Sequence, residues 1–236
     1  MTAQVQAVVF DLGETLVDET RHWAMVARYT GVPEFTLAGV LGGLIERREN
    51  HRSIFGLMQI ESVDPNVIGY RIEERDLYPD VVPVLRQLRA AGYRLGVSGN
   101  QPEGAAEQTA ALGLPFDLIA SSAIWGVSKP DPAFFERIAS ELELSPPQIV
   151  YVGDRLDNDV LPAQAIGMHA VFLRRGPWGY LHAGWPEMAT VVHRIEHLGG
   201  IHQVIERIDG DRTKRVSPSE AADVAFLRDQ NETGVP

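Results

Sequence analysis

VVFDLGETLV, residues 8–17, is the stretch of sequence that decides the expected fold. Its apolar run is too short for a comfortable helix and ends abruptly in an acidic residue, which predicts a buried strand that runs into a loop. Asp11 then stands where the strand ends. In open parallel α/β sheets the ligand crevice lies outside the carboxyl ends of the strands, so this position would aim Asp11 at a substrate. A turn or helix-cap aspartate is the alternative, and this stretch alone does not separate the two.

The composition is that of an ordinary globular chain. Its 236 residues, 44% of them hydrophobic, are enough for an α/β core with an insertion. A formal net charge of −11 disfavours nucleic acid and anionic lipid as partners. The absence of cysteine excludes disulfides, thiolate catalysis and cysteine-ligated zinc. No signal peptide is recognisable and no apolar run approaches the roughly 20 residues of a membrane span, so we expect a cytoplasmic protein.

Two patterns of hydrophobic residues divide the chain. Apolar residues recur at helical spacing between residues 18 and 78, which predicts a helical insertion. From residue 79 to 173, predicted helices alternate with short predicted strands, and this indicates a parallel sheet with helices on both faces. We therefore expect an α/β fold with a doubly wound, Rossmann-like parallel sheet. Its segments would be the core, 1–17 and 79–205, the insertion, 18–78, and a polar C-terminal extension, 206–236.

The alternation loosens beyond Arg175. Residues 176–180 indicate an irregular loop, and a helix is expected from Ala189 to Leu198. Such a helix would place His193 and His197 one turn apart, a spacing that could hold zinc, although a charged helix face explains it equally simply. A short helix is also expected near residues 219–227.

Four loops should gather at the carboxyl edge of the sheet, and each carries a different chemical group. Phosphoryl transfer to a carboxylate needs such a set, because a nucleophile accepts the group, hydroxyl and ammonium groups hold its oxygens, and a hard cation on oxygen ligands neutralises charge. Each group also has an ordinary alternative as a turn residue, a helix cap or a solvated charge. In chain order the candidates are Asp11, Ser98, Lys129, Asp154, Asp157 and Asp159.

These motifs, in this order, resemble those of the haloacid dehalogenase-like hydrolases. The matching loops lie between residues 5 and 173 and read FDLGETL (10–16), VSGN (97–100), KP (129–130) and VGDRLDND (152–159). The resemblance implies that the insertion is the small helical cap of that family. The reaction stays open, because the family includes phosphatases, phosphotransferases, phosphonate hydrolases and dehalogenases.

Roles follow from the resemblance by matched position. It implies that Asp11 is the nucleophile and that Ser98 and Lys129 hold the phosphate. Mg²⁺ is the implied cofactor, with Asp159 binding it directly or through water, and the full ligand set is Asp11, the carbonyl of Gly13, Asp154 and Asp159. We assign substrate contacts to four loop residues and to two residues of the insertion's basic cluster, namely Gly13, Glu14, Gly99, Asn100, Arg47 and His51. Arg174 and Arg175 leave the last strand of the alternation on the same edge and are further candidates.

Gly13 departs from the family pattern. Family phosphatases usually carry an aspartate there, two residues after the nucleophile, as general acid and base. Positioned proton transfer is worth about 10² to 10⁴ in rate, so we expect slow turnover of unactivated alkyl esters. Glu14 is a possible substitute, but neighbouring residues of a strand face opposite ways. A substrate with a good leaving group or a base from the cap are the other routes, and Gly13→Asp is expected to raise turnover.

The sequence therefore predicts a Mg²⁺-dependent hydrolase of a small phosphorylated metabolite that works through an aspartyl-phosphate on Asp11. A metal-independent dehalogenase with the same nucleophile is the first alternative. A binding or regulatory protein that lost turnover with Gly13 is the second. The substrate's identity and the oligomeric state cannot be inferred from the sequence.

Overall fold

A computed structural model describes residues 4–61 and 67–215, with side chains as far as residue 210. Its centre is a sheet of six strands in the order β3-β2-β1-β4-β5-β6, and every neighbouring pair is parallel. This confirms the expected α/β fold. The chain winds outward in opposite directions from β1, so the crevice predicted for such sheets lies between β1 and its neighbours. The strands are β1 (Ala7–Phe10), β2 (Arg94–Gly99), β3 (Leu118–Ser121), β4 (Ile149–Gly153), β5 (His169–Leu173) and β6 (His193–Ile195).

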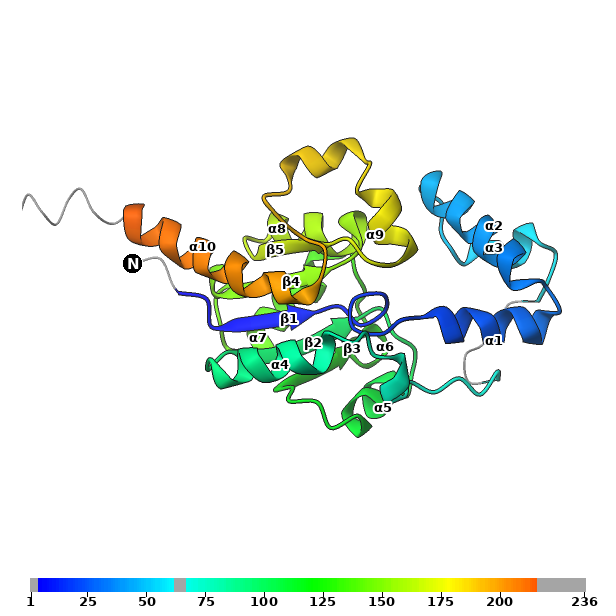
Figure 1. Ribbon diagram of the computed structural model, residues 1–236, viewed down its shortest axis with the longest axis horizontal. Helices are drawn as coiled ribbons and strands as arrows, with labels where there is room; N and C mark the ends of the chain where they lie inside the picture. Colours follow the sequence, from blue (N-terminus) through cyan, green and yellow to red (C-terminus); the bar gives the residue numbers. More distant parts are fainter. Residues whose placement is uncertain (1–3, 62–66, 216–236) are drawn as a thin grey trace, which may run out of the picture.

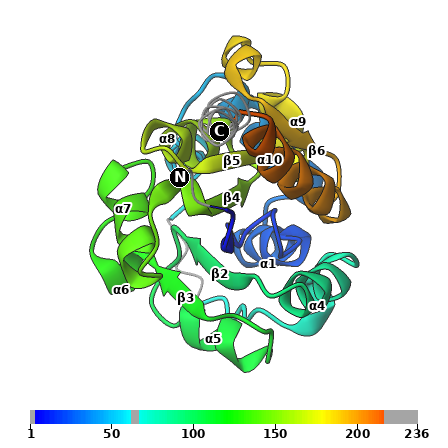
Figure 2. The same cartoon turned by 90° about the vertical axis from the view of Figure 1, so that its left-hand side faces the viewer.

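Helices cover both faces of the sheet, as Figure 2 shows. Successive side chains of a strand face opposite ways, so Val8 and Phe10 pack toward α4 and α10, whereas Ala7 and Val9 pack toward α7 and α8. Side chains of β1 are thus buried on both faces, which explains why its sequence is continuously apolar. The helices that flank the sheet are α4 (Val81–Ala90), α5 (Ala105–Ala111), α6 (Ser122–Trp125), α7 (Pro132–Glu141), α8 (Leu161–Ala165), α9 (Gly176–His182) and α10 (Ile201–Arg215).

The insertion forms a small helical unit beyond the carboxyl ends of the strands (Figure 1). It comprises α1 (Thr20–Thr30), α2 (Glu34–Glu46) and α3 (Ser53–Leu57). Gly31 ends α1 in the left-handed region, with φ at 72°, and its N–H bonds to the carbonyl of Ala27. The apolar side chains of the three helices form their own cluster, to which Trp178 of α9 contributes from the core. Packing of α2 against α9, together with the ion pair between Arg48 and Glu187, therefore holds the insertion against the sheet domain.

Short 3₁₀ and π turns connect the larger elements. They are η1 (Glu74–Asp76), η2 (Pro146–Gln148), η3 (Leu156–Val160), η4 (Pro186–Thr190) and η5 (Leu198–Gly200). The π turn η3 carries the acidic residues of the fourth motif and leads directly into α8. This segment therefore begins with one wide turn and continues as the regular helix α8.

The expected helix at Ala189–Leu198 is wrong. The segment instead contains the end of η4 and the strand β6, which pairs with the exposed edge of β5. Pairing with an open sheet edge satisfies more backbone groups than a short isolated helix could, and it overrides the local pattern. His193 and His197 consequently do not share a helix face. The expected loop at residues 176–180 is also wrong, because it forms most of α9 with Pro177 in the first turn.

The C-terminal boundary expected at residue 205 falls inside α10. Val204, Ile205 and Ile208 of this helix are buried in the same apolar cluster as β1. The helix expected near residues 219–227 lies outside the described residues. Within the described residues, no helix has the length and apolar character needed to cross a membrane.

Candidate active site

A cleft of about 980 Å³ lies between the carboxyl edge of the sheet and the insertion. The loops after β1, β2, β3 and β4 all reach it, as the four motifs predict. Its floor contains Asp11, Lys129 and Asp154, and its opposite wall contains residues 48–52 of the insertion. The four loops that are far apart in the sequence are therefore brought to one site.

Lys129 lies between two acidic side chains at the bottom of the cleft. Its Nζ lies 2.7 Å from Oδ1 of Asp11 and 2.5 Å from Oδ1 of Asp159. Burial opposes the charge of this ammonium, but the two carboxylates raise the pKa of Lys129 well above its usual range. The lysine is thus held as a cation beside the predicted nucleophile, where it can also meet an anionic substrate.

The backbone of the lysine loop is held by Asn100. Its side-chain nitrogen donates to the carbonyl of Lys129 and its side-chain oxygen accepts from the N–H of Lys129, both at 2.8 Å. Asp131 caps α7 by accepting from the N–H of Ala133 at 2.9 Å. Asn100 lines the cleft as expected, but both groups of its amide bind the lysine loop, so its contribution is to position Lys129.

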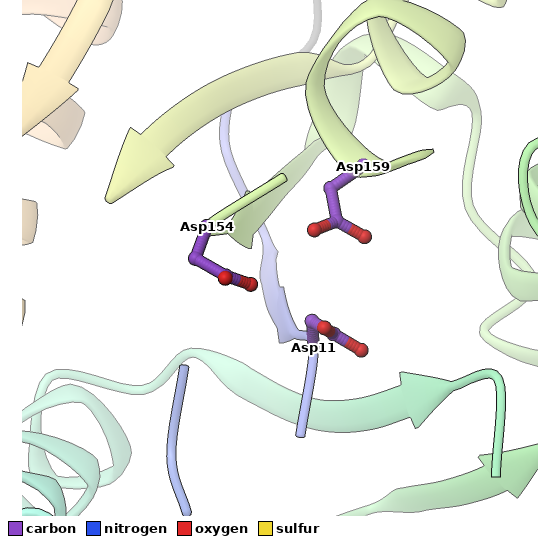
Figure 3. A group of neighbouring side chains, drawn as sticks. All are labelled: Asp11, Asp154 and Asp159. Atoms are coloured by element: carbon purple, nitrogen blue, oxygen red, sulfur yellow. The ribbon is translucent and has the colours of Figure 1, made fainter. Parts of the chain in front are cut away.

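Three buried carboxylates face one another across a small space (Figure 3). We call Asp11, Asp154 and Asp159 the carboxylate cluster; one oxygen of each lies within 4.8 Å of the others. Asp11 follows β1 and its N–H bonds to Val152 of β4, while Asp154 follows β4 itself. The adjacent positions of β1 and β4 in the sheet therefore bring the two aspartates together.

The carboxylate cluster has too few cationic partners for its charge. Oδ1 of Asp154 accepts from the Thr15 hydroxyl at 3.4 Å, but the buried Oδ2 has no hydrogen-bond partner among the described residues. Burial and the nearby charges of Asp159 and Asp11 raise the pKa of Asp154 well above its usual range. A buried carboxylate without a partner is costly. A hard divalent cation on oxygen ligands would remove that cost, so these donors fit a metal ion such as Mg²⁺.

Asp159 has more hydrogen-bond partners than the other two members of the carboxylate cluster. Besides Lys129, it accepts from the N–H of Arg155 at 3.0 Å through Oδ2. Burial raises the pKa of Asp159 to about 6, although Lys129 lowers it. Both oxygens already have partners, so Asp11 and Asp154 are the better candidates for direct metal ligands.

Two glutamates flank the other side of the nucleophile loop; we call Glu14 and Glu19 the glutamate pair. Glu14 has φ at 54°, and its carboxylate accepts from the Tyr78 hydroxyl at 2.6 Å and from the N–H of Glu19 at 3.2 Å. Burial raises the pKa of Glu14. Burial, followed by the charges of Glu14 and Asp11, raises the pKa of Glu19 to about 8. Both residues line the cleft.

Ser98 does not lie where a phosphate-holding hydroxyl is expected. It is fully buried in β2, does not line the cleft, and its Oγ has no partner among the described residues. The residue of β2 that faces the nucleophile is Gly99, because a methyl group built on it would lie 2.6 Å from Oδ1 of Asp11. Ser98 lies one residue beyond the Phe10–Val97 pair, as Asp11 does, but its side chain is buried beneath the residues that line the cleft. The groups that line the cleft after this strand are Asn100 and Gln101.

The basic residues of the insertion divide between the cleft and the surface. Arg47 pairs with Glu49 at 2.9 Å on an exposed face and does not line the cleft, contrary to its expected substrate contact. His51 does line it, with its ring edge-on to Trp178 at 5.6 Å between centroids. Burial and the charges of nearby arginines lower the pKa of His51 to about 4, so this imidazole is neutral near pH 7.

Arg174 and Arg175, the further candidates for substrate contact, do not line the cleft. Arg174 pairs with Glu196 on the surface. Arg175 donates to the carbonyl of Thr15 at 2.9 Å and to Asp80 at 2.6 Å, so it helps to hold the backbone of the nucleophile loop in place.

Two charged cleft residues, Arg155 and Glu19, are among those that the sequence pattern does not single out. Arg155 lies over the Trp178 ring at 5.4 Å and pairs with Asp157 at 3.0 Å. Its position inside the fourth motif, between Asp154 and Asp157, is a signal in the sequence that points to it. Glu19 stands directly before α1, and nothing in the local pattern separates it from an ordinary helix-start acid.

Comparisons with known proteins agree with this geometry. The family model of the haloacid dehalogenase-like hydrolases matches residues 5–167. A glyceraldehyde 3-phosphate phosphatase of Methanopyrus kandleri is 32% identical over 74% of this chain and 86% of its own. A phosphoglycolate phosphatase of Cereibacter sphaeroides is 32% identical over 81% of this chain and 91% of its own. The crystal structure of a predicted phosphoglycolate phosphatase from Haemophilus somnus superposes with a TM-score of 0.63 at 21% identity, over 86% of this chain and 99% of that one.

Proposed function

The chain belongs to the haloacid dehalogenase-like hydrolase family and is a hydrolase, and from that premise we propose that it hydrolyses a small phosphorylated metabolite. The observation that carries the proposal is the pairing of two features around Asp11. A buried ammonium lies 2.7 Å from this carboxylate, and a neighbouring buried aspartate oxygen has no protein partner. The first suits the anionic oxygens of a phosphate, and the second suits a divalent cation.

Asp11 is the proposed nucleophile. One of its oxygens attacks phosphorus, the bond from phosphorus to the ester oxygen breaks, and an aspartyl-phosphate forms. Lys129 stabilises the negative charge on the phosphoryl oxygens, and Asn100 keeps its backbone in place. Water then attacks the same phosphorus, which releases phosphate and restores the carboxylate of Asp11.

The proposed metal ligands are Asp11, Asp154 and the carbonyl of Gly13, with Asp159 near enough to contribute directly or through water. A bound Mg²⁺ would neutralise negative charge on the transferring group and reduce repulsion between the phosphate and the carboxylate cluster. Without a cation, three carboxylates and one ammonium would repel an incoming dianion. The same surplus of negative charge disfavours a metal-independent dehalogenase.

The cap side of the cleft supports an anionic substrate. Arg48 and Arg52 line the cleft from the insertion, and Arg155 lines it from the loop after β4; Arg48 is also paired with Glu187. Guanidinium groups bind phosphate and carboxylate oxygens in a bidentate manner. The relatives named above carry the names of phosphatases for glyceraldehyde 3-phosphate and phosphoglycolate. We propose that the substrate is a phosphate ester of similar size.

A phosphate-release panel tests the proposal. Short phosphate monoesters, including glyceraldehyde 3-phosphate and phosphoglycolate, are offered with Mg²⁺ and with a chelator, and Asp11→Asn serves as the blank. We expect turnover that needs the metal and falls to the blank level in the variant. Halide release from a short haloacid without metal would contradict the proposal, and so would full activity of folded Asp11→Asn.

A further inference from the structure

Glu19 occupies the space that a side chain on residue 13 would fill. A methyl group built on Gly13 would lie 2.4 Å from Oε1 of Glu19 and 3.0 Å from its carboxyl carbon. Both distances are far shorter than ordinary contacts between carbon and its neighbours. The carboxyl group from six positions later in the chain therefore takes the place beside the nucleophile that Gly13 leaves empty.

The backbone on both sides of Glu19 holds this placement. The N–H of Glu19 donates to Oε1 of Glu14 at 3.2 Å, and its carbonyl accepts from the N–H of Trp23 at 3.0 Å in the first turn of α1. The residue lines the main cleft and a smaller neighbouring cavity of about 120 Å³. Its carboxyl group thus stands in the wall of the cleft, on a rigid helix start rather than on a free loop.

Glu19 has no structural ion pair that would explain its position. Among the described residues, none of the ion pairs includes it. Glu14 differs, because the hydroxyl of Tyr78 and the N–H of Glu19 already engage its two oxygens. The Glu19 carboxyl group has the Trp23 side chain as a hydrogen-bonding neighbour but no charged partner in the described part of the chain, so it is the less engaged of the two glutamates and the one better placed to act on a substrate.

We propose that Glu19 is the general acid and base of this enzyme, an inference that rests on the phosphohydrolase function proposed above. In the first step the carboxyl proton of Glu19 passes to the ester oxygen as its bond to phosphorus breaks, so the leaving group departs as a neutral alcohol. In the second step the resulting carboxylate takes a proton from the water that attacks the aspartyl-phosphate. Glu19 is thereby returned to its acid form, and no further reactant is needed.

Gly13 and Glu19 then form an interdependent pair. A side chain on residue 13 would have to displace the carboxyl end of Glu19, whereas the backbone conformation of residue 13 does not itself favour glycine. The expectation that Gly13→Asp raises turnover is accordingly revised: with Glu19 present, the new side chain would compete with the existing carboxyl group for the same space. Gly13→Asp should help only when Glu19 is shortened.

Leaving-group dependence is the sharpest test. In Glu19→Gln, kcat/KM for alkyl phosphates should fall by about 10² to 10⁴, whereas kcat/KM for p-nitrophenyl phosphate should change little, because p-nitrophenolate leaves without a proton. Mixing that variant with p-nitrophenyl phosphate should give a rapid burst of one p-nitrophenolate per enzyme followed by slow turnover, since the second step still lacks its base. Glu34→Gln, an exposed glutamate of α2, is the matched control and should behave as wild type.

A second variant moves the carboxyl group back to residue 13. Glu19→Ala should lose activity on alkyl phosphates, and Gly13→Asp added to it should recover most of that loss. The inference is overturned if folded Glu19→Gln keeps full kcat/KM on alkyl phosphates, or if alkyl and aryl substrates lose activity equally. A wild-type enzyme that hydrolyses no phosphate ester would instead overturn the proposed function and this inference with it.

Discussion

Buried carboxyl groups lie on both sides of Asp11, but within the described structure only those on one side have a cationic partner. On one side Lys129 contacts both Asp11 and Asp159, and burial raises the pKa of Asp159 only to about 6. On the other side the glutamate pair has no ion pair among the described residues, and burial raises the pKa of Glu19 to about 8. Burial is common to both sides, so the cationic partner decides which carboxyl group is kept anionic. The side with Lys129 is suited to binding an anionic group, and the side with the glutamate pair is suited to carrying a proton.

Removing the ammonium group of Lys129 should have the largest effect on stability. Lys129→Met leaves Asp11 and Asp159 buried without their ammonium, and loss of one partner of a buried ion pair costs about 3 to 5 kcal/mol of unfolding free energy. Denaturant unfolding in a chelator measures this loss, and phosphate release should fall with it. Arg89→Met, which breaks only an exposed pair with Asp117, is the control and should change little. Equal stability of the two variants would show that the buried ion pairs of Lys129 contribute no more than the exposed pair of Arg89.

Neutralising the unpaired member of the carboxylate cluster should have the next largest effect. Ligand at about 100 times its dissociation constant stabilises a protein by about 2.7 kcal/mol, so wild type should gain that much from Mg²⁺ and lose it with a chelator. Asp154→Asn should lose this gain, yet be no less stable than wild type without metal, because the substitution removes a buried carboxyl group whose Oδ2 has no partner among the described residues. Thermal unfolding with and without Mg²⁺ measures both. A variant that Mg²⁺ still stabilises fully would exclude Asp154 as a ligand.

A buried histidine, His182, extends the comparison of buried groups. Burial raises the pKa of a carboxyl group but lowers the pKa of an imidazole, because it disfavours the charged form of each. Burial lowers the pKa of His182 to about 4, and its Nδ1 accepts from the N–H of Leu156 at 3.0 Å. The unfolded chain, with a histidine pKa of about 6.5, therefore binds this proton first, and stability falls as the pH drops from 6.5 toward 4.

At pH 5 this single histidine should cost about 2 kcal/mol of unfolding free energy relative to pH 7. Unfolding of His182→Gln at the two pH values tests the prediction, since glutamine can still accept the bond but does not titrate. The variant should lose about 2 kcal/mol less than wild type on acidification. The same loss in both proteins would show that His182 titrates normally in the folded state.

Local patterns predicted most of the core, and failed where the sheet edge intervened. Strands β1 to β5 follow from short apolar runs that end in polar residues, a pattern with strand length and little ambiguity. The helix expected at residues 189–198 fails because the edge of β5 offers backbone hydrogen-bond partners to His193–Ile195, and no local pattern records that edge. Ser98 shows the same limit at finer scale, since the sequence places it at the correct strand end but does not reveal that its side chain is buried and does not line the cleft.

The sequence by itself determined the α/β class, the insertion after the first strand, and the acidic and basic residues that meet at one edge, because the order of parallel strands brings their carboxyl ends together whatever the loops contain. Only the tertiary structure decided which of those groups has a charged partner, which aspartate oxygen is left unpaired, and that Glu19 fills the space beside Gly13. Such facts depend on distances of a few ångströms between residues whose separation along the chain carries no information about their contact.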